Sequence, residues 1–600
     1  MAYKNLRQFM DTLEAKGQLV KVAAEVDREL EITEIADRVS KGYGPALLFE
    51  HVRGCEFPLL INAMGTYERM ALGLGVADLD EAGRSIGDWL DLTTYLGLWG
   101  KIKKLPKLPR FATVFPQKIP LGACQEVVEM APDLDKLPIL KCWPKDGGRF
   151  MTLPLVITKD PDTGMQNTGM YRMQQFDKTT TGMHWHLHKD GREIYEAYRL
   201  RGGKMPVSVA FGCDPAITYA ATAPLPKMID EMMFAGYLRK FPVTLVKSKT
   251  NDIYVPSEAE IVLEGYVDVD APLKLEGPFG DHTGYYSLAD FYPVFHVTCI
   301  THKKNAVFPA TIVGKPPMED CYLGKATERI FLPLIRMTTP EILDYNFPLE
   351  GVFHNCVIVS IKKRFPGHAY KVMNALWGAG QMMYTKMIVV VDADVNPHHI
   401  ENVLEATMAH VRIDKDLFVT PGPLDALDHA SATPHFGHRL GIDVTTKWEA
   451  EGGTLEVAHK GPRDLSKVPG LSDAVRFHVW EFGGKAILVA ALRKEKATDV
   501  RDFIKGALAS GYFKIVVAVD VQVDPKEASV VSWKVFNNID AARDLLYHEG
   551  AFGIDATKKL PLEGHMRPWP DDIEMSPEIK ALVTRRWAEY GIEVTYPESP

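Results

Sequence analysis

A segment of the chain occurs twice, and this repetition constrains the fold more than any other feature. Residues 386–397 read KMIVVVDADVNP and residues 514–525 read KIVVAVDVQVDP, an offset of 128. Residues 441–447 (GIDVTTK) return at 553–559 (GIDATKK) with an offset of 112, so the second copy lacks about 16 residues around 421–432. Val-rich buried strands can resemble one another by chance, but two matches in the same order favour a duplicated unit.

The repeated unit reads as alternating strands and helices. Apolar runs at 357–361 and 387–391 flank a helical pattern at 369–379, which is typical of βαβ units on a parallel sheet. We therefore predict a C-terminal α/β oligomerisation domain at 329–450. Residues 451–600 are predicted to hold the second, degenerate repeat with a structural role, followed by the C-terminal tail.

The rest of the chain predicts two further domains. Residues 1–114 mix helical patterns with short apolar runs, which indicates a small α/β domain, and the basic stretch 101–110 with its two prolines is the best linker candidate. Short β-rich runs separated by Gly and Pro turns fill 115–328 and favour a barrel or sandwich. The fold class is thus α/β, more broadly a multidomain α+β chain.

Composition excludes several classes of protein. The 600 residues are 46% hydrophobic and carry a net charge of −9 without any basic block, which argues against nucleic acid as a partner. No apolar run approaches the length that a membrane span requires, and no signal peptide is expected. The seven scattered cysteines include no Cys-x-x-Cys pair, so we expect buried thiols and a cytoplasmic protein.

A run of histidines is the first candidate for chemistry. His184, His186 and His188 alternate along residues 183–191, so in a strand they would share one face and could meet a metal or a phosphate. A solvated strand face would give the same pattern. Upstream, Asn167 and Arg172 would then be a turn residue and a surface cation.

Two carboxylates flank a tight turn in the second candidate. Glu276 and Asp281 enclose Gly-Pro-Phe-Gly, and a turn of this kind could bring both acids to one cavity, where one would hold a proton and act as a general acid. The alternative is a turn capped by its own acids. Glu231 is a weaker candidate, because an acid beside an apolar helix face usually lies on the surface.

Several ordered motifs together resemble the UbiD family of reversible aromatic and acrylic acid decarboxylases. They are NTGMYR at 167–172, MHWHLHK at 183–189 and EGPFGDHTGYY at 276–286, joined by PVSVAFG at 206–212, IVLEGY at 261–266, YTK at 384–386 and GID at 441–443. The resemblance covers about residues 1–450, and 553–569 is similar to the family's carboxyl end.

The resemblance implies prenylated FMN bound in a central split-barrel domain, because a side chain cannot delocalise the charge left when CO2 departs. It also implies a divalent cation, usually manganese, with Asn167, His188 and Glu231 as ligands, and leaves open whether K⁺ binds too. Further flavin contacts implied by motif position are Met170, Tyr171, Arg172, His184, Trp185, His186, Lys189, Asp190 and Lys386. This chain reads HWHLHKD where ubiquinone-pathway members read RWLSHRG, so the phosphate contacts are less specific than the metal ligands.

The same resemblance assigns the catalytic residues. Arg172 and Glu276 would form an ion pair beside the reacting carbon. Asp281 would donate the proton that replaces CO2 and would remove it in the reverse direction.

The length of the chain resembles that of longer family members linked to menaquinone formation. The substrate hypothesis is accordingly a prenylated dihydroxy-naphthoate, with a polyprenyl-4-hydroxybenzoate or a catabolic aromatic acid as the alternative. A metal-dependent hydrolase and a non-catalytic assembly protein remain as other classes. Expected partners are the aromatic acid, CO2, a flavin prenyltransferase that supplies the cofactor, a peripheral membrane surface at most, and further copies of the chain in a dimer or hexamer.

Overall fold

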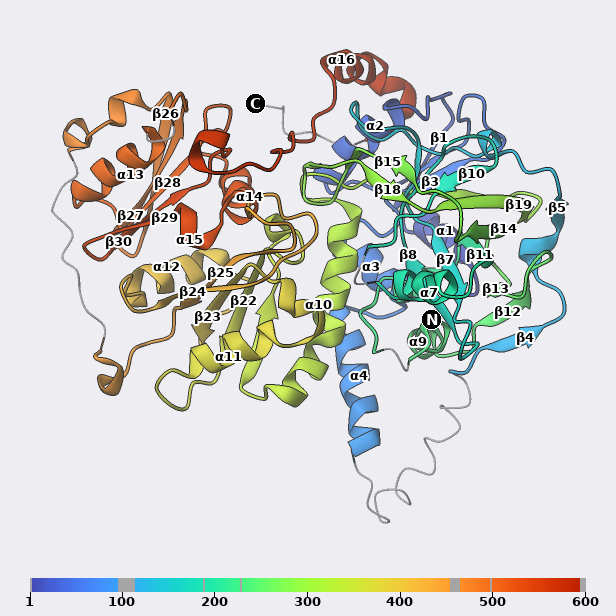
Figure 1. Ribbon diagram of the computed structural model, residues 1–600, viewed down its shortest axis with the longest axis horizontal. Coiled ribbons are helices and arrows are strands. Elements are labelled where there is room, and N and C mark those ends of the chain that lie inside the picture. Colours follow the sequence, from blue (N-terminus) through green and yellow to red (C-terminus); the bar gives the residue numbers. More distant parts are fainter. Residues whose placement is uncertain are drawn as a thin grey trace. The chain divides into compact units, whose positions relative to one another are not determined.

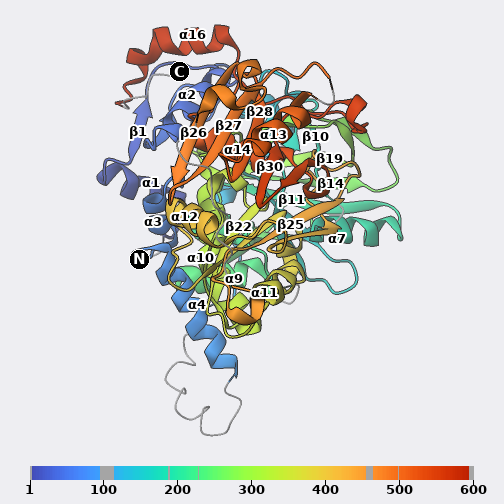
Figure 2. The same cartoon turned by 90° about the vertical axis from the view of Figure 1, so that its left-hand side faces the viewer.

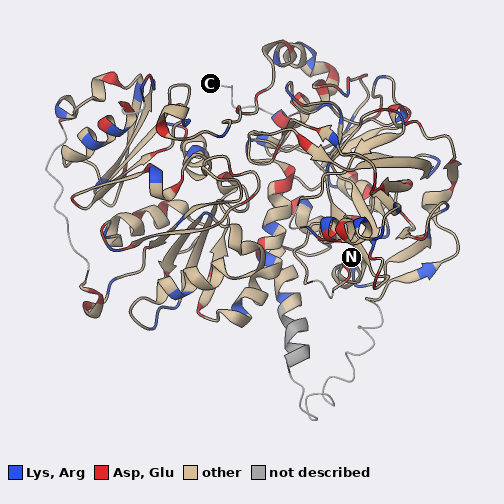
Figure 3. Ribbon diagram, viewed as in Figure 1, with Lys and Arg blue, Asp and Glu red and all other residues tan. Residues whose placement is uncertain are grey.

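The computed structural model describes residues 3–94, 114–186, 189–226, 229–453, 464–496 and 499–593 (Figure 1). The chain forms two compact units. The first contains residues 1–330 and 571–600, and the second contains residues 331–570. Acidic and basic residues are interspersed along the elements of both units (Figure 3). Among the described residues, every helix is too short or too polar to cross a bilayer.

The N-terminal part of the first unit is a small α/β layer. Its strands form a sheet in the order β1-β2-β3-β20. Leu6, Phe9, Met10 and Leu13 are buried on one face of α1, as their spacing predicts. The elements are α1 (Leu6–Ala15), β1 (Leu19–Val22), α2 (Glu31–Lys41), β2 (Ala46–Phe49), β3 (Leu59–Ile61), α3 (Tyr67–Leu74), α4 (Leu79–Thr94) and β20 (Phe308–Pro309).

The centre of the first unit is a seven-stranded antiparallel sheet in the order β10-β19-β14-β11-β7-β8, with β5 also paired to β19. The strands are β5 (Val127–Glu129), β7 (Leu155–Lys159), β8 (Gln166–Met170), β10 (Thr180–Gly182), β11 (Lys204–Phe211), β14 (Ile261–Asp268) and β19 (Val294–His302). The helices α7 (Asp190–Arg199), α8 (Pro215–Ala220) and α9 (Glu231–Arg239) follow these strands.

Smaller strand groups complete the central domain. The pairs β15 (Lys274–Glu276) with β18 (Asp290–Tyr292), and β16 (Phe279–Gly280) with β17 (Tyr286–Ser287), carry the acidic motif. The others are β6 (Phe150–Met151) with β9 (Met173–Gln174), and β4 (Gln117–Ile119), β12 (Thr244–Lys247) and β13 (Tyr254–Pro256). Six of the seven cysteines are buried, as expected for structural thiols.

The second unit contains the duplicated fold, which confirms the prediction from the repeat. Its two five-stranded sheets have the equivalent orders β21-β22-β23-β25-β24 and β26-β27-β28-β30-β29. The first copy comprises β21 (Ile342–Asn346), β22 (Cys356–Ile361), α11 (His368–Trp377), β23 (Met387–Asp392), α12 (Ile400–His410), β24 (Leu417–Pro423) and β25 (Phe436–Asp443). The second comprises β26 (Arg476–Phe482), β27 (Lys485–Leu492), α13 (Asp499–Ala509), β28 (Ile515–Asp520), α14 (Ala528–Asn538), α15 (Ala541–Asp544), β29 (Leu545–His548) and β30 (Ala551–Asp555).

The residues that the second copy lacks lie in one hairpin. In the first copy, residues 424–435 connect β24 to β25, whereas in the second only Glu549 and Gly550 connect β29 to β30. Both residues have positive φ, 40° and 77°, as a two-residue hairpin requires. We call residues 424–435 the insertion loop.

The C-terminal tail returns to the first unit, although the sequence grouped it with the second repeat at 451–600. Helix α16 (Pro577–Arg586) lies against α2 (Figures 1 and 2). The Tyr590 hydroxyl donates to the Glu31 carboxylate at 2.7 Å, and Arg586 forms an ion pair with the same group. Buried polar contacts of this kind fix the tail on the N-terminal layer.

Candidate active site

Arg172 is the centre of a buried polar cluster in the first unit. Its Nε donates to Glu276 Oε1 at 3.1 Å, its Nη1 to Asp281, and its Nη2 to Ser287 Oγ at 3.1 Å. The guanidinium carbon lies 4.7 Å from the centre of the Phe279 ring. Only 9% of the arginine side chain is exposed, so this residue is not a surface cation. The expected ion pair of Arg172 with Glu276 is present in the geometry, and Asp281 is a second carboxylate partner of the same guanidinium.

The glycines of the acidic motif allow the chain to turn tightly enough to bring both acids to Arg172. Gly277 has a φ of 93°, which side-chain-bearing residues rarely adopt. A Cβ at Gly280 would lie 2.3 Å from the Trp143 ring. Glycine is therefore required at both positions for the turn between β15 and β16.

His184 joins the cluster from the segment that follows β10. Its Nδ1 lies within hydrogen-bond distance of Glu276 Oε2, and its Nε2 lies 2.9 Å from His186 Nε2. The Tyr292 ring packs against His184, with centroids 4.2 Å apart. His184 thus connects His186 to Glu276, a link that the sequence did not indicate.

The charges in the cluster decide which groups are ionised. Burial alone would raise the pKa of Glu276, but Arg172 and His184 outweigh it and lower this pKa. Burial would likewise raise the pKa of Asp281, and the His282 hydrogen bond with the Arg172 charge lowers it well below its ordinary value. Burial and the nearby Arg172 lower the pKa of His184, against the pull of Glu276. Asp281 is therefore a carboxylate at neutral pH in the ligand-free protein.

Two supporting groups had no signal in the sequence. Asp146 accepts hydrogen bonds from the backbone N–H groups of Gly280 and Trp143, both at 2.8 Å, and burial raises the pKa of Asp146 to about 7. The tail also contacts the loop that carries Asp281, because Ile573 N donates to Gly284 O at 2.9 Å. Tyr286 N in turn donates to Asp571 O at 3.2 Å. Both contacts hold the acidic loop from outside the motif.

Asn167 and Glu231, two of the three residues that were expected to bind a metal, lie side by side. Asn167 Nδ2 donates to Glu231 Oε1 at 3.2 Å, and Thr168 N donates to Glu231 Oε2 at 3.0 Å. Asn167 Oδ1 is buried without a hydrogen-bond partner among the described residues. Burial raises the pKa of Glu231 to about 7, a shift that a cation would offset. The third predicted ligand, His188, lies outside the described residues, and in the described part no group of three His, Cys, Asp or Glu side chains is arranged around a metal position.

Five other residues that were predicted to contact the flavin differ in their exposure and in their hydrogen-bond partners. The Tyr171 hydroxyl accepts from Gly191 N at 3.4 Å, and Met170 N donates to Ala221 O at 3.2 Å. Trp185 is only 1% exposed and packs near Tyr195. Lys189 and Asp190 are exposed at the start of α7. Their contact with a flavin stays a prediction.

Lys386 lies in the second unit and has other partners. Its Nζ forms an ion pair with Asp428 at 2.6 Å and donates to Phe536 O at 3.3 Å and Asn537 O at 3.0 Å. These three contacts surround the ammonium group. The surroundings of Lys386 therefore give no support to the expected contact with the flavin phosphate.

Comparison with protein families matches the N-terminal layer and the central domain of the first unit and both repeats of the second. The N-terminal, Rift-related and C-terminal domain models of 3-octaprenyl-4-hydroxybenzoate carboxy-lyase match residues 10–88, 117–316 and 321–444, and the C-terminal model also matches 465–563. An uncharacterized protein of Archaeoglobus fulgidus is 52% identical over 454 residues, 75% of this chain and 94% of the relative. One of Aquifex aeolicus is 47% identical over 457 residues, 76% and 94% of the respective chains.

Solved structures agree with the sequence matches. Vanillic acid decarboxylase of Sedimentibacter hydroxybenzoicus is 28% identical with a TM-score of 0.66, covering 77% of this chain and 97% of that one. The UbiD-class enzyme HmfF of Pelotomaculum thermopropionicum, solved with FMN, is 27% identical with a TM-score of 0.65, covering 78% and 98%. Fold and site together define a carboxy-lyase. The chain belongs to the UbiD family of decarboxylases, with the family's C-terminal domain present twice.

Proposed function

We propose that the protein catalyses the non-oxidative, reversible decarboxylation of an aromatic carboxylic acid. The observation that carries this proposal is the buried Arg172, which bonds Glu276 and Asp281 at once. A guanidinium held between two carboxylates can also bind the carboxylate of a substrate. One of the two protein carboxylates then lies close enough to the substrate to transfer a proton.

Each residue has a distinct part in this scheme. Glu276 fixes Arg172 and His184 by accepting from both. Arg172 orients the substrate carboxylate. When Arg172 also binds that carboxylate, its positive charge stabilises the Asp281 carboxylate less. The pKa of Asp281 then rises towards the range where Asp281 can take up a proton. Asp281 then donates this proton to the carbon that has lost CO2, and accepts it in the carboxylation direction.

Prenylated FMN is the cofactor that we propose for this site. HmfF has been solved with FMN and, in an evolved dimeric form, with prFMN, and the orphan Asn167 Oδ1 beside Glu231 suits a divalent cation. When bound, the prenylated flavin would supply the electron sink for the charge left by CO2. Asn167 and Glu231, with His188, would hold manganese or another divalent cation, and K⁺ remains open as a further ion.

Replacing the Asp281 carboxylate by an amide tests proton transfer separately from flavin binding. We expect Asp281→Asn to lower turnover by roughly 100- to 10,000-fold, because the amide cannot act as the acid, while the flavin stays bound. Asp290→Asn is the matched control, since this exposed carboxylate lies opposite Glu276 in the β15–β18 pair. CO2 release and the flavin absorbance of denatured samples are the readouts. Full turnover by Asp281→Asn contradicts the assignment.

The cofactor proposal has its own experiment. The protein is co-produced with a flavin prenyltransferase, the proposed supplier, and released small molecules are identified by mass spectrometry alongside metal analysis. We expect prenylated flavin with manganese, and loss of the metal in Glu231→Gln because one anionic ligand is removed. Protein that carries metal but never flavin overturns the cofactor assignment.

A prenylated dihydroxy-naphthoate in menaquinone formation is the substrate that we propose. The support is the resemblance of the long chain to menaquinone-type members of the family, and such an acid would be met at the membrane surface by a cytoplasmic protein with peripheral association at most. The alternative is a polyprenyl-4-hydroxybenzoate or a catabolic aromatic acid. CO2 release from hydroxybenzoates but never from naphthoates by the loaded enzyme favours the alternative.

A metal-dependent hydrolase would use the histidines differently. It would need His184 and His186 to bind an ion together, whereas His184 uses one ring nitrogen for Glu276 and the other for His186. Turnover without flavin that is lost in His186→Ala would favour the hydrolase.

A further inference from the structure

The two copies in the second unit contact each other through equivalent lysines. Lys386, which precedes β23, donates to the carbonyls of Phe536 and Asn537 in the last turn of α14. Lys514, which precedes β28, donates to the carbonyls of Met408 at 2.7 Å and Val411 at 2.9 Å, where α12 ends. Each lysine thus donates hydrogen bonds to carbonyls at the carboxyl end of a helix in the other copy, where the last carbonyls have no partner within their own helix.

The two contacts are related by a single offset. Lys386 and Lys514 are 128 residues apart, and so are the starts of α12 at Ile400 and α14 at Ala528. A contact from the first copy to the second is therefore matched by the same contact in the opposite direction. This reciprocity defines an isologous interface, the kind by which two identical subunits form a two-fold dimer.

The apolar residues of the central strands follow the same symmetry. Met387, Val389 and Val391 of β23 belong to one buried cluster, which also contains Ile515, Val517 and Val519 of β28. The alternate residues face the other way. Ile388 and Val390 pack with residues of α11, and Val516 and Ala518 pack with residues of α13. Each sheet therefore has one face closed by its own helix and the other closed by the opposite copy.

Equivalent polar networks confirm which residues correspond. In the first copy Lys363 binds Glu451 at 2.6 Å and Thr445 Oγ1 at 3.0 Å. In the second, Lys494 binds Glu563 at 2.7 Å and Thr557 Oγ1 at 3.0 Å. The correspondence thus extends beyond the strands to the loops at their carboxyl ends.

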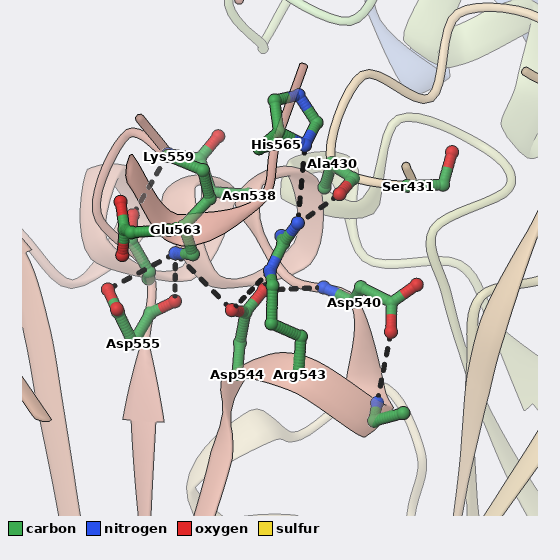
Figure 4. A network of polar contacts seen from close by, with 12 residues as sticks. Ala430, Ser431, Asn538, Asp540, Arg543, Asp544, Asp555, Lys559, Glu563 and His565 are labelled. Atoms are coloured by element: carbon green, nitrogen blue, oxygen red, sulfur yellow. Dashed lines mark hydrogen bonds and ion pairs between the residues drawn. The ribbon is translucent and has the colours of Figure 1, made fainter. Parts of the chain in front are cut away.

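The insertion loop breaks the symmetry. Arg543 donates to Ala430 O at 2.9 Å (Figure 4), and His429 Nε2 lies 3.1 Å from Asn538 Oδ1. At the offset of 128, the first copy has Lys415 in place of Arg543 and His410 in place of Asn538. The insertion loop therefore contacts groups that only the second copy carries. These contacts favour pairing of the first copy with the second over pairing of the first copies of two chains.

We infer that the second copy is a built-in partner, which occupies within one chain the surface through which a single-copy chain would pair with its twin. Without it, Met387, Val389 and Val391 would be exposed on one face, and an apolar patch of this kind marks an association surface. The matched stretch takes up 94% of the Archaeoglobus and Aquifex relatives, which leaves them too short for a second copy. The inference does not depend on the reaction, and it replaces the expected self-association of this chain through its C-terminal domain.

Cross-linking of the full chain tests whether the pairing is internal. Ser529 Oγ donates to Glu350 Oε1 at 2.8 Å across the rim of the interface. Ser529→Cys and Glu350→Cys are combined in one chain. Chains labelled with heavy isotopes and unlabelled chains are mixed during refolding. A short bismaleimide then joins the two introduced thiols. The single variants serve as controls for adventitious links through the native cysteines.

We expect linked peptides in which both halves carry the same isotope label. Linked peptides with mixed labels would show that the second copy pairs with another chain, and absence of the link despite reaction of both thiols would show that the faces do not meet. Either result overturns the inference. Sedimentation equilibrium of the single-copy Archaeoglobus relative tests the partner surface itself. We expect a mass of two chains, and a relative that stays monomeric at all concentrations overturns this part.

Discussion

Two buried arginine clusters, one in each unit, contain similar groups in different settings. Arg172 bonds two carboxylates, Glu276 of β15 and Asp281 of the turn after β16, and its guanidinium also faces an aromatic ring. Arg543 bonds both oxygens of one neighbour, Asp544, each at 2.8 Å, and its other donors go to Ala430 O and His565 (Figure 4). The first arginine joins acids that belong to a functional motif, and the second joins two copies of a fold.

The two clusters differ in whether the partners of their carboxylates can also bind a ligand. Asp544 accepts from the backbone N–H of Asp540 as well as from Arg543, so its hydrogen bonds are local and complete. Asp281 relies on Arg172 and on His282, and both partners can be shared with a ligand. A buried arginine with its acids is thus no indicator of catalysis by itself.

Removal of Arg172 has the largest expected effect on function. Arg172→Met should lower kcat/KM by roughly 100- to 1,000-fold, because the substrate carboxylate loses its charged partner. The measurement is the initial rate of CO2 release with cofactor occupancy monitored by absorbance. Arg149→Met is the control, since Arg149 pairs with Asp135 at 2.7 Å outside the cluster. Activity within a few-fold of wild type would place Arg172 among the structural arginines.

The corresponding change in the second unit should act on stability. Arg543→Met removes the cation that is hydrogen-bonded to Asp544, which is 1% exposed, and leaves only Lys559 at 3.7 Å. The change should lower the free energy of unfolding of the second unit by roughly 3 kcal/mol. Chemical denaturation followed by tryptophan fluorescence measures this loss, with turnover per folded enzyme unchanged. A variant of normal stability that loses turnover would contradict the division between the two clusters.

The duplicated fold was accessible from the sequence because its signals are local. The placement of Met387, Val389 and Val391 on one face of β23 follows directly from the period of a strand, and the same pattern returns in the second copy. The position of the tail was not accessible, because it depends on contacts such as Ile573 N to Gly284 O between distant parts of the chain. The packing of one copy on the other is long-range in the same sense.

Only the site residues that lie within the recognised motifs could be predicted from the sequence. Arg172, Glu276 and Asp281 lie within recognisable segments, and the structure brings them together. Asp146 lies in no motif, so nothing in its neighbourhood indicated that it holds Gly280. His184 was predicted to line a flavin, and its contact with Glu276 could not be derived because the register between the two segments is set by tertiary packing.

Lys514 offers a pH test of the interface between the copies. Burial lowers the pKa of Lys514 to about 8, the nearby Lys485 adds to this effect, and Asp416 opposes it. Between pH 8 and 10.5, where 10.5 is the ordinary pKa, the folded protein has lost this proton and the unfolded chain retains it. Stability contributed by this site therefore rises with pH in that window. Compared with Lys514→Met, wild type should gain stability from pH 8 to 10.5, as measured by urea unfolding, whereas parallel profiles would contradict the shift.

The smallest effect is expected where the tail meets the acidic loop at the surface. Lys145 pairs with Asp571 at 2.6 Å, but both side chains are more than half exposed, and such pairs contribute at most about 1 kcal/mol. Lys145→Ala should therefore change kcat less than about fivefold, because the loop is still held by the backbone bonds of Ile573 and Tyr286. Parallel measurement of kcat at low and high salt in wild type should show equally little change, since salt screens the same pair. A loss of turnover as large as that of Arg172→Met would mean that the tail, and not the motif, fixes the position of Asp281.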